Sequence, residues 1–104
     1  MHQNFDYTHL PERFTREMGC EASYLRDRLP AASNSLAIAW QHEGASITIN
    51  EGQLTLHWQA LAPRRIALMV SPRLLVTFTF EQVPLVDRVA FMRYFDLYTR
   101  RGGG

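Results

Sequence analysis

The chain has 104 residues, 46% of them hydrophobic, which is ordinary for a single folded domain over residues 1–104 and too apolar for a disordered segment. Its formal net charge is +1, so the protein has no overall field that would attract nucleic acid or acidic lipid. The one cysteine, Cys20, excludes an intramolecular disulfide and a zinc site made of several cysteines, and it favours a reducing compartment such as the cytoplasm.

The beginning of the chain is predicted to be helical. After a polar stretch at residues 1–9, which we expect to be flexible, apolar residues recur every three or four positions over residues 10–29. Gly19 disfavours a continuous helix, and Pro30 favours an end before it. We therefore expect one interrupted helix or two short ones. The apolar stripe consists of Leu10, Phe14, Met18, Ala22, Leu25 and Leu29.

The middle of the chain is predicted to form an antiparallel sheet. Beyond a connector at residues 30–35, the spacing of the large apolar residues changes to a period of two, which is typical of strands. A loop is expected at residues 60–65 and a turn at residues 71–73. The predicted strands are residues 36–41, 45–50, 54–59, 66–70 and 74–80.

Two turns predict the register of the first three strands. Gly44 and Gly52 each occupy the second central position of a possible two-residue hairpin, where glycine supplies a positive φ. Trp40 would then lie opposite Ile47, and Ile47 opposite Leu56, on one apolar face. Because side chains alternate between the two faces of a sheet, a one-residue slip would scramble this arrangement.

The last element is predicted to be an amphipathic helix over residues 84–101, followed by Gly102 and a flexible tail at residues 102–104. The expected fold class is α+β: a single antiparallel β-meander of four to five strands, with the C-terminal helix packed across one face and an N-terminal helical segment. A partly closed small barrel capped by the same helix is the alternative. The helix would cover the sheet with Leu85, Val89, Met92 and Phe95.

Three functions are compatible with these patterns. The first is a small non-enzymatic interaction module, homodimeric through the C-terminal helix or a strand edge, because large apolar residues also occur around the rest of that helix. Phe91, Tyr94 and Tyr98 would anchor the interface. The partner would be a second copy or another protein.

The second function is a single-stranded nucleic-acid-binding module, in which arginines contact phosphates and aromatic rings stack on bases. Several aromatic residues are predicted to face the core, however, where they could not stack on a base. The arginine rim of such a module would consist of Arg64, Arg65, Arg73, Arg100 and Arg101.

The third function is a small-ligand binder or enzyme on the polar sheet face, using His57, Gln41 and Ser46, which the predicted register places in one row. The sequence contains no dinucleotide-binding, phosphate-loop, nucleophile-elbow or metalloprotease motif, so we expect no cofactor and no metal. The first residues lack a secretory signal, and Pro72 and Arg73 interrupt the longest apolar run. We therefore expect no membrane partner.

Overall fold

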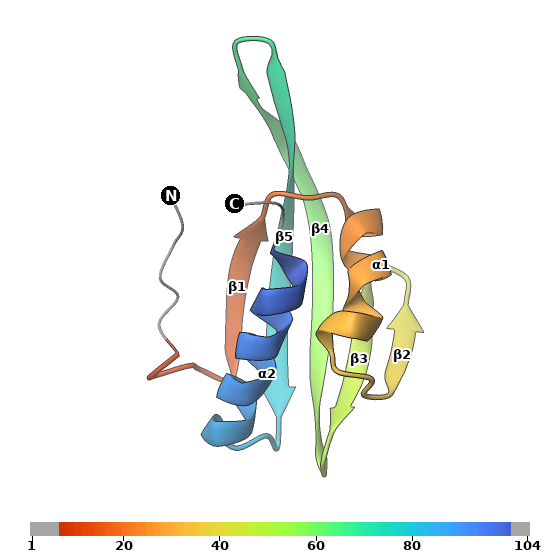
Figure 1. Cartoon of the computed structure of the whole chain (residues 1–104), viewed down its shortest axis with the longest axis vertical. Coiled ribbons are helices and arrows are strands. Elements are labelled where there is room, and N and C mark those ends of the chain that lie inside the picture. The colour runs from red at the N-terminus through yellow and green to blue at the C-terminus, as the bar shows by residue number, and fades with distance from the viewer. Residues whose placement is uncertain (1–6, 101–104) are drawn as a thin grey trace.

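The computed structural model describes residues 7–100 and has an α+β fold, a five-stranded antiparallel sheet with two helices (Figure 1). The expected fold class is confirmed. The strand order is β1-β5-β4-β3-β2, so β2 to β5 form a meander and β1 is added beside β5. Our expectations for residues 1–6 and 101–104 lie outside the described residues. The elements are β1 (Arg13–Met18), α1 (Ala22–Ala32), β2 (Ile38–Gln41), β3 (Gly44–Ile49), β4 (Gly52–Ile66), β5 (Met69–Glu81) and α2 (Leu85–Thr99).

The first predicted helical stretch is wrong, because it contains strand β1. Phe14 and Met18 are four residues apart, and this spacing fits one face of a strand as well as one face of a helix. The ring of Phe14 stacks on that of Phe78 in β5 with centroids 4.9 Å apart. Backbone pairing of β1 with β5 therefore takes precedence over the helical spacing.

The second predicted helical stretch is confirmed as α1, although the helix continues past Pro30 to Ala32. Leu25, Leu29 and Ala32 are buried along one side of it. Pro30 cannot donate the helical hydrogen bond to the carbonyl four residues earlier, but the burial of this side stabilises the helix, because packing contributes more to a helix in a protein than local preference does. The helix ends at Ala32, and the next residue, Ser33, caps it: its backbone N–H donates to the Leu29 carbonyl at 2.9 Å.

Strands β4 and β5 are much longer than predicted. The expected loop at residues 60–65 belongs to β4, and the expected turn at residues 71–73 belongs to β5. The pairing shifts between Leu61 and Arg64, where Pro63 lies in an irregularity of the ladder. A proline is tolerated at such a site because it has no ladder hydrogen bond to lose. The chain reverses only at residues 67–68, between the paired Ile66 and Met69.

The predicted register of the meander is wrong by two residues, but its faces are correct. Trp40 lies opposite Ala45, and Ile47 lies opposite Leu54. A two-residue shift preserves the face of each side chain, since the period of a strand is two. Position 44 does not have the positive φ that was predicted to require glycine there. Glycine is needed for close packing, because a Cβ at this position would lie 2.3 Å from the Leu56 carbonyl oxygen.

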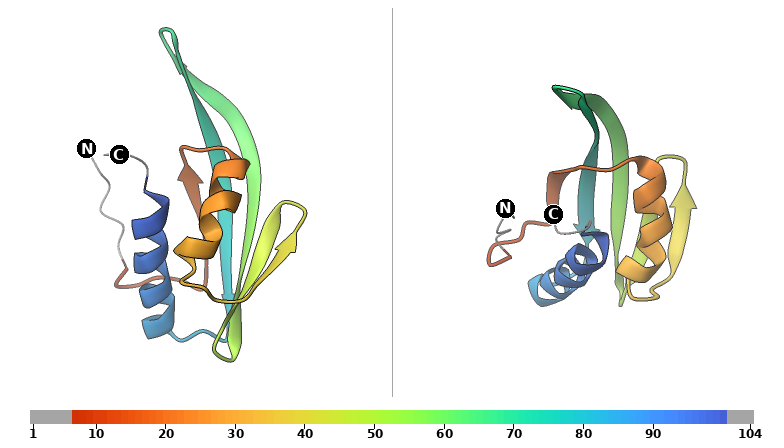
Figure 2. Two further views of the ribbon diagram at one scale, coloured as in Figure 1. Left: turned by 45° about the vertical axis from the view of Figure 1, so that its right-hand side comes forward. Right: turned by 45° about the horizontal axis from the view of Figure 1, so that its top comes forward.

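Both helices lie on the same face of the sheet, as the two views of Figure 2 show. The core forms between this face and the helices, and it includes Phe78 and Phe95, whose rings meet edge to face at 5.4 Å. The sheet is open, with β1 and β2 at its edges, so the barrel alternative is wrong. Among the described residues, no element covers the opposite face, which carries Ser46, Thr55 and His57.

Candidate functional site

The polar residues of the third hypothesis lie on the uncovered sheet face. Gln41 and His57 each pair with Gly44, so these three positions form one row across β2, β3 and β4. Ser46 pairs with Thr55 in the next row. The predicted row of Gln41, Ser46 and His57 is therefore corrected: Gln41 and His57 share a row and are exposed, and Ser46 lies half-buried in the next row.

The arginines of the second hypothesis are partly engaged within the chain. The Arg73 guanidinium donates to both carboxylate oxygens of Glu17 at 2.9 and 3.0 Å, and Arg64 lies 3.5 Å from the same carboxylate. Hydrogen bonding to Arg73 lowers the pKa of Glu17. Arg65 lies further along β4, and Arg100 follows the end of α2. Arg101 lies outside the described residues.

The aromatic residues of the first hypothesis divide into two groups. Phe91 is only 6% exposed and packs against Phe80 and Phe95, with centroids 6.2 and 6.0 Å away, so it belongs to the core. Tyr94 and Tyr98 are more exposed, and their rings contact each other at 4.7 Å. The side of α2 that faces the sheet is therefore shifted from the predicted stripe, and Leu85 is exposed.

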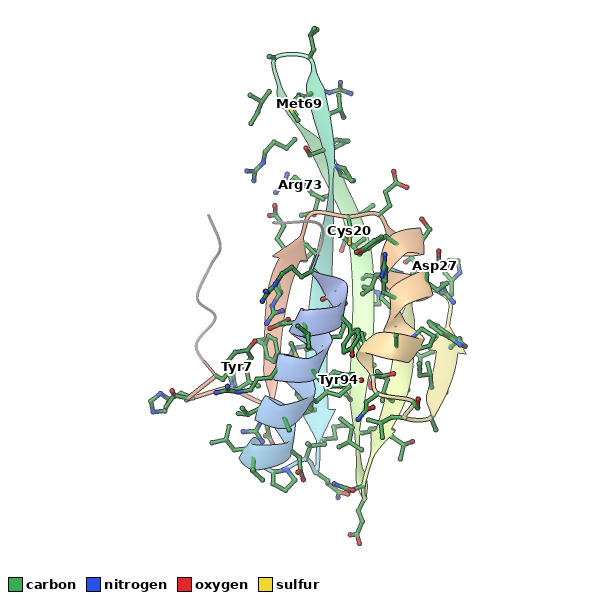
Figure 3. The ribbon with its side chains drawn as sticks, in the orientation of Figure 1. Tyr7, Cys20, Asp27, Met69, Arg73 and Tyr94 are labelled. Atoms are coloured by element: carbon green, nitrogen blue, oxygen red, sulfur yellow. The ribbon has the colours of Figure 1, made fainter. Side chains whose placement is uncertain are left out.

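The most exposed apolar residues lie outside the three sites predicted from the sequence. The ends of β4 and β5 project from the molecule as a two-stranded arm, with Met69 near its far end (Figure 3). At the tip, Leu68 is 99% exposed, Met69 70% and Ile66 64%. The sequence signal was the unbroken apolar run at residues 66–70, which lacks the polar alternation of a strand with one wet face.

A groove opens between the two helices at the end of the molecule away from the arm. It has a volume of about 340 Å³. Its apolar side includes Ile49, Ala90 and Phe91, and Tyr94 lies beside them. Asp87 provides a negative charge at the groove, and its carboxylate accepts a hydrogen bond from Asn50 at 3.4 Å. The groove thus combines an apolar lining with one acidic group.

Helix α2 is tied to the start of the described chain by polar contacts. The Asp96 carboxylate accepts hydrogen bonds from the Tyr7 hydroxyl and from the Arg16 guanidinium. Arg88 donates to the Leu10 carbonyl at 3.0 and 3.2 Å and to the Val83 carbonyl at 2.7 Å. Asp96 and Arg88 thus each have partners within the chain, and we assign both sets of contacts to the stability of the fold.

The contact with Asp96 predicts a pH dependence of stability. Burial and the hydrogen bond to Asp96 raise the pKa of Tyr7 from 10.0 to about 12. The folded chain therefore holds the phenolic proton after the unfolded chain has lost it, and the free energy of unfolding falls as the pH rises from about 10 to about 12. We expect denaturant titrations to show this loss in the wild type and a smaller one in Tyr7→Phe.

The difference between these two chains isolates Tyr7, because the other tyrosines titrate in both. Their stability difference should be constant below about pH 9.5 and should change above it. Curves that stay parallel up to pH 11.5 would show that Tyr7 has the same pKa in the folded and unfolded chains.

Comparison with models of known protein families, with curated proteins and with solved structures finds no significant match to this chain. Over residues 7–100, no cluster of three or more His, Cys, Asp or Glu side chains could hold a metal ion. Neither of the helices in that range is long and apolar enough to cross a membrane.

Proposed function

We propose that this protein is a small non-enzymatic interaction module that forms a homodimer through the tip of the β4–β5 arm. The observation that carries the proposal is the exposure of Ile66, Leu68 and Met69 at one end of the molecule. Monomeric proteins seldom expose adjacent large apolar side chains without a partner for them. A second copy of the chain carries apolar surface of the same kind, and it is present wherever the first copy is.

The backbone of the tip supports this proposal. Ala67 has φ 54°, in the left-handed region, where a non-glycine residue costs about 1–2 kcal/mol. A two-residue hairpin usually has glycine or asparagine at such a position. The arm also projects as an isolated pair of strands, which is marginally stable in water on its own. Contact with a second copy would stabilise both the turn and the ribbon.

The surroundings of the tip favour protein over nucleic acid as its partner. Glu17 binds Arg73 and lies beside Arg64, so these arginines are less available for phosphate. A cytoplasmic location remains our expectation, because Cys20 is the one cysteine and is buried in the core.

Sedimentation at several protein concentrations tests the proposal. We expect a dimer for the wild type and a monomer for Leu68→Ser combined with Met69→Ser, because serine removes the apolar contact area. The matched control exchanges the two residues, Leu68→Met with Met69→Leu, and should remain a dimer, since such swaps conserve volume and apolar character.

Two further conditions separate the alternatives. Association through an apolar tip should persist at high salt, since salt screens exposed charges but not apolar contact, and a short oligo-dT should not alter it. A wild-type chain that stays monomeric at high micromolar concentration would overturn the proposal. Faster sedimentation with oligo-dT at low salt alone would instead support the arginine rim.

A further inference from the structure

The groove between α1 and α2 matches the arm tip in chemistry. Ile49, Ala90 and Phe91 line it with apolar groups, and it offers about 340 Å³, which is at the lower end of the range for binding pockets in proteins, about 300–1,000 Å³. The side chains of Leu68 and Met69 are unbranched at Cβ, so they can extend from a turn into a narrow groove.

The apolar surface of the groove continues along α2. Val86 is 73% exposed and Leu97 is 59% exposed, and both lie on the turn-by-turn spacing that includes Ala90 and Tyr94. Neither Val86 nor Leu97 contributes to the buried core of its own chain. Together the groove and this side of α2 form an apolar surface that a second chain could cover.

The charges of the tip and the groove are opposite. Arg65 pairs with Val70 in the ladder, one step behind the apolar tip, and over residues 7–100 no carboxylate lies within salt-bridge distance of its guanidinium. Asp87 supplies a carboxylate at the groove. An arginine beside an inserted apolar tip would thus find a partner of opposite charge, which favours one orientation of the two chains.

The tip and the groove lie so far apart in one chain that contact between them requires two chains. The molecule is 47 Å long, and the arm points along this axis, away from the end of α2 that carries Asp87 (Figures 1 and 3). An extended arm cannot turn back to the groove of its own chain. Two chains in antiparallel orientation can each offer a tip to the groove of the other, and this arrangement closes at two copies.

We infer that the β4–β5 arm tip of one copy inserts into the groove between α1 and α2 of a second copy, and that the second copy does the same in return. The inference rests on the proposed homodimer and assigns its contact residues. It brings Leu68 and Met69 against Ala90 and Tyr94 of the other chain. The two reciprocal contacts double the area that a single tip could bury.

Disulfide trapping between two marked chains tests this contact. A chain with Leu68→Cys and a longer tag is mixed with an untagged chain carrying Ala90→Cys, and a mild oxidant is added. Cysteines that approach to about 4.4–6.8 Å between Cα atoms can bond, so we expect a disulfide dimer of one tagged and one untagged chain. Gln59→Cys, on the uncovered sheet face, replaces Ala90→Cys in the matched control and should give no such dimer.

Other trapped species would overturn the inference without affecting the homodimer. Tagged chains bonded to each other would show that two tips meet, and bonding to Gln59→Cys would place the tip on the open sheet. A wild-type monomer in sedimentation would overturn the proposed function itself. Tip-dependent flotation of that monomer with anionic phospholipid vesicles would identify lipid as the partner of the tip.

Exchange of charges gives a second measurement. We expect Arg65→Glu and Asp87→Arg each to raise the Kd of the dimer about tenfold, as for the loss of about 1.4 kcal/mol, and the double variant to recover most of the affinity. Recovery in the double variant requires that the two positions face each other. Equal weakening in the double variant, with no recovery, would overturn the assigned orientation.

Discussion

Replacement of Phe95 by alanine is expected to lower the free energy of unfolding by about 3–5 kcal/mol. Phe95 belongs to α2, and its side chain is fully buried between this helix and the sheet. Its ring meets that of Phe78 edge to face at 5.4 Å and stacks with that of Phe91 at 6.0 Å. Alanine would remove both ring contacts and leave a cavity between helix and sheet. Denaturant unfolding followed by circular dichroism measures the loss.

The association of two chains must not contribute to this measurement, because binding stabilises the folded state by mass action. The variants are therefore compared in the Leu68→Ser, Met69→Ser background. Leu97→Ala is the matched control on the same helix, since Leu97 is 59% exposed and should cost less than about 1 kcal/mol. If Phe95→Ala fails to fold, Phe95→Leu should show a smaller loss in the same direction. Equal losses at positions 95 and 97 would contradict the packing of α2.

The faces of the meander could be predicted from the sequence because they depend only on alternation. Ile47 and Leu56 lie on the core face whichever two-residue register is chosen. The register itself could not be predicted, because it depends on where two backbones approach. Gly52 illustrates this: a Cβ there would lie 2.2 Å from the Gln82 carbonyl oxygen, a residue thirty positions later in the chain.

Strand β1 and the arm could not be predicted for a different reason. The spacing of Phe14 and Met18 fits two kinds of element, and only the tertiary pairing with β5 decides between them. Pro63 indicates a loop by local rules, whereas the ladder accommodates it in an irregularity. Local rules therefore place the apolar run at residues 66–70 in a strand of the sheet, and its exposure at the end of the arm follows only from the tertiary fold.

The candidate site combines residues that lie far apart in the sequence, in the meander and in α2, and this explains why sequence reasoning found only part of it. Tyr94 was expected at an interface because α2 is apolar around most of its circumference, and it lies beside the groove. The groove also requires Ile49, which is brought to α2 by the fold of the meander. The arm tip and the groove lining are both apolar, and for this reason we propose a second copy as the partner.

Replacement of Asp96 by alanine is expected to lower the free energy of unfolding by about 2–4 kcal/mol. Asp96 is 17% exposed and Arg16 19% exposed, so water screens their ion pair only in part. Removal of the carboxylate takes away the ion pair that the Arg16 guanidinium makes with α2 and the hydrogen bond that the Tyr7 hydroxyl donates to it. Denaturant unfolding at pH 7 measures the loss.

A double variant separates the value of the ion pair from the penalty of a single half-buried charge. Arg16→Met with Asp96→Leu replaces both charges by apolar groups and should recover most of the stability lost in Asp96→Ala, because no charge then remains to be desolvated. Glu17→Ala is the matched control: Glu17 also binds arginine, but at the surface, where its loss should matter much less. A double variant as unstable as Asp96→Ala would show that the charges themselves hold β1 against α2.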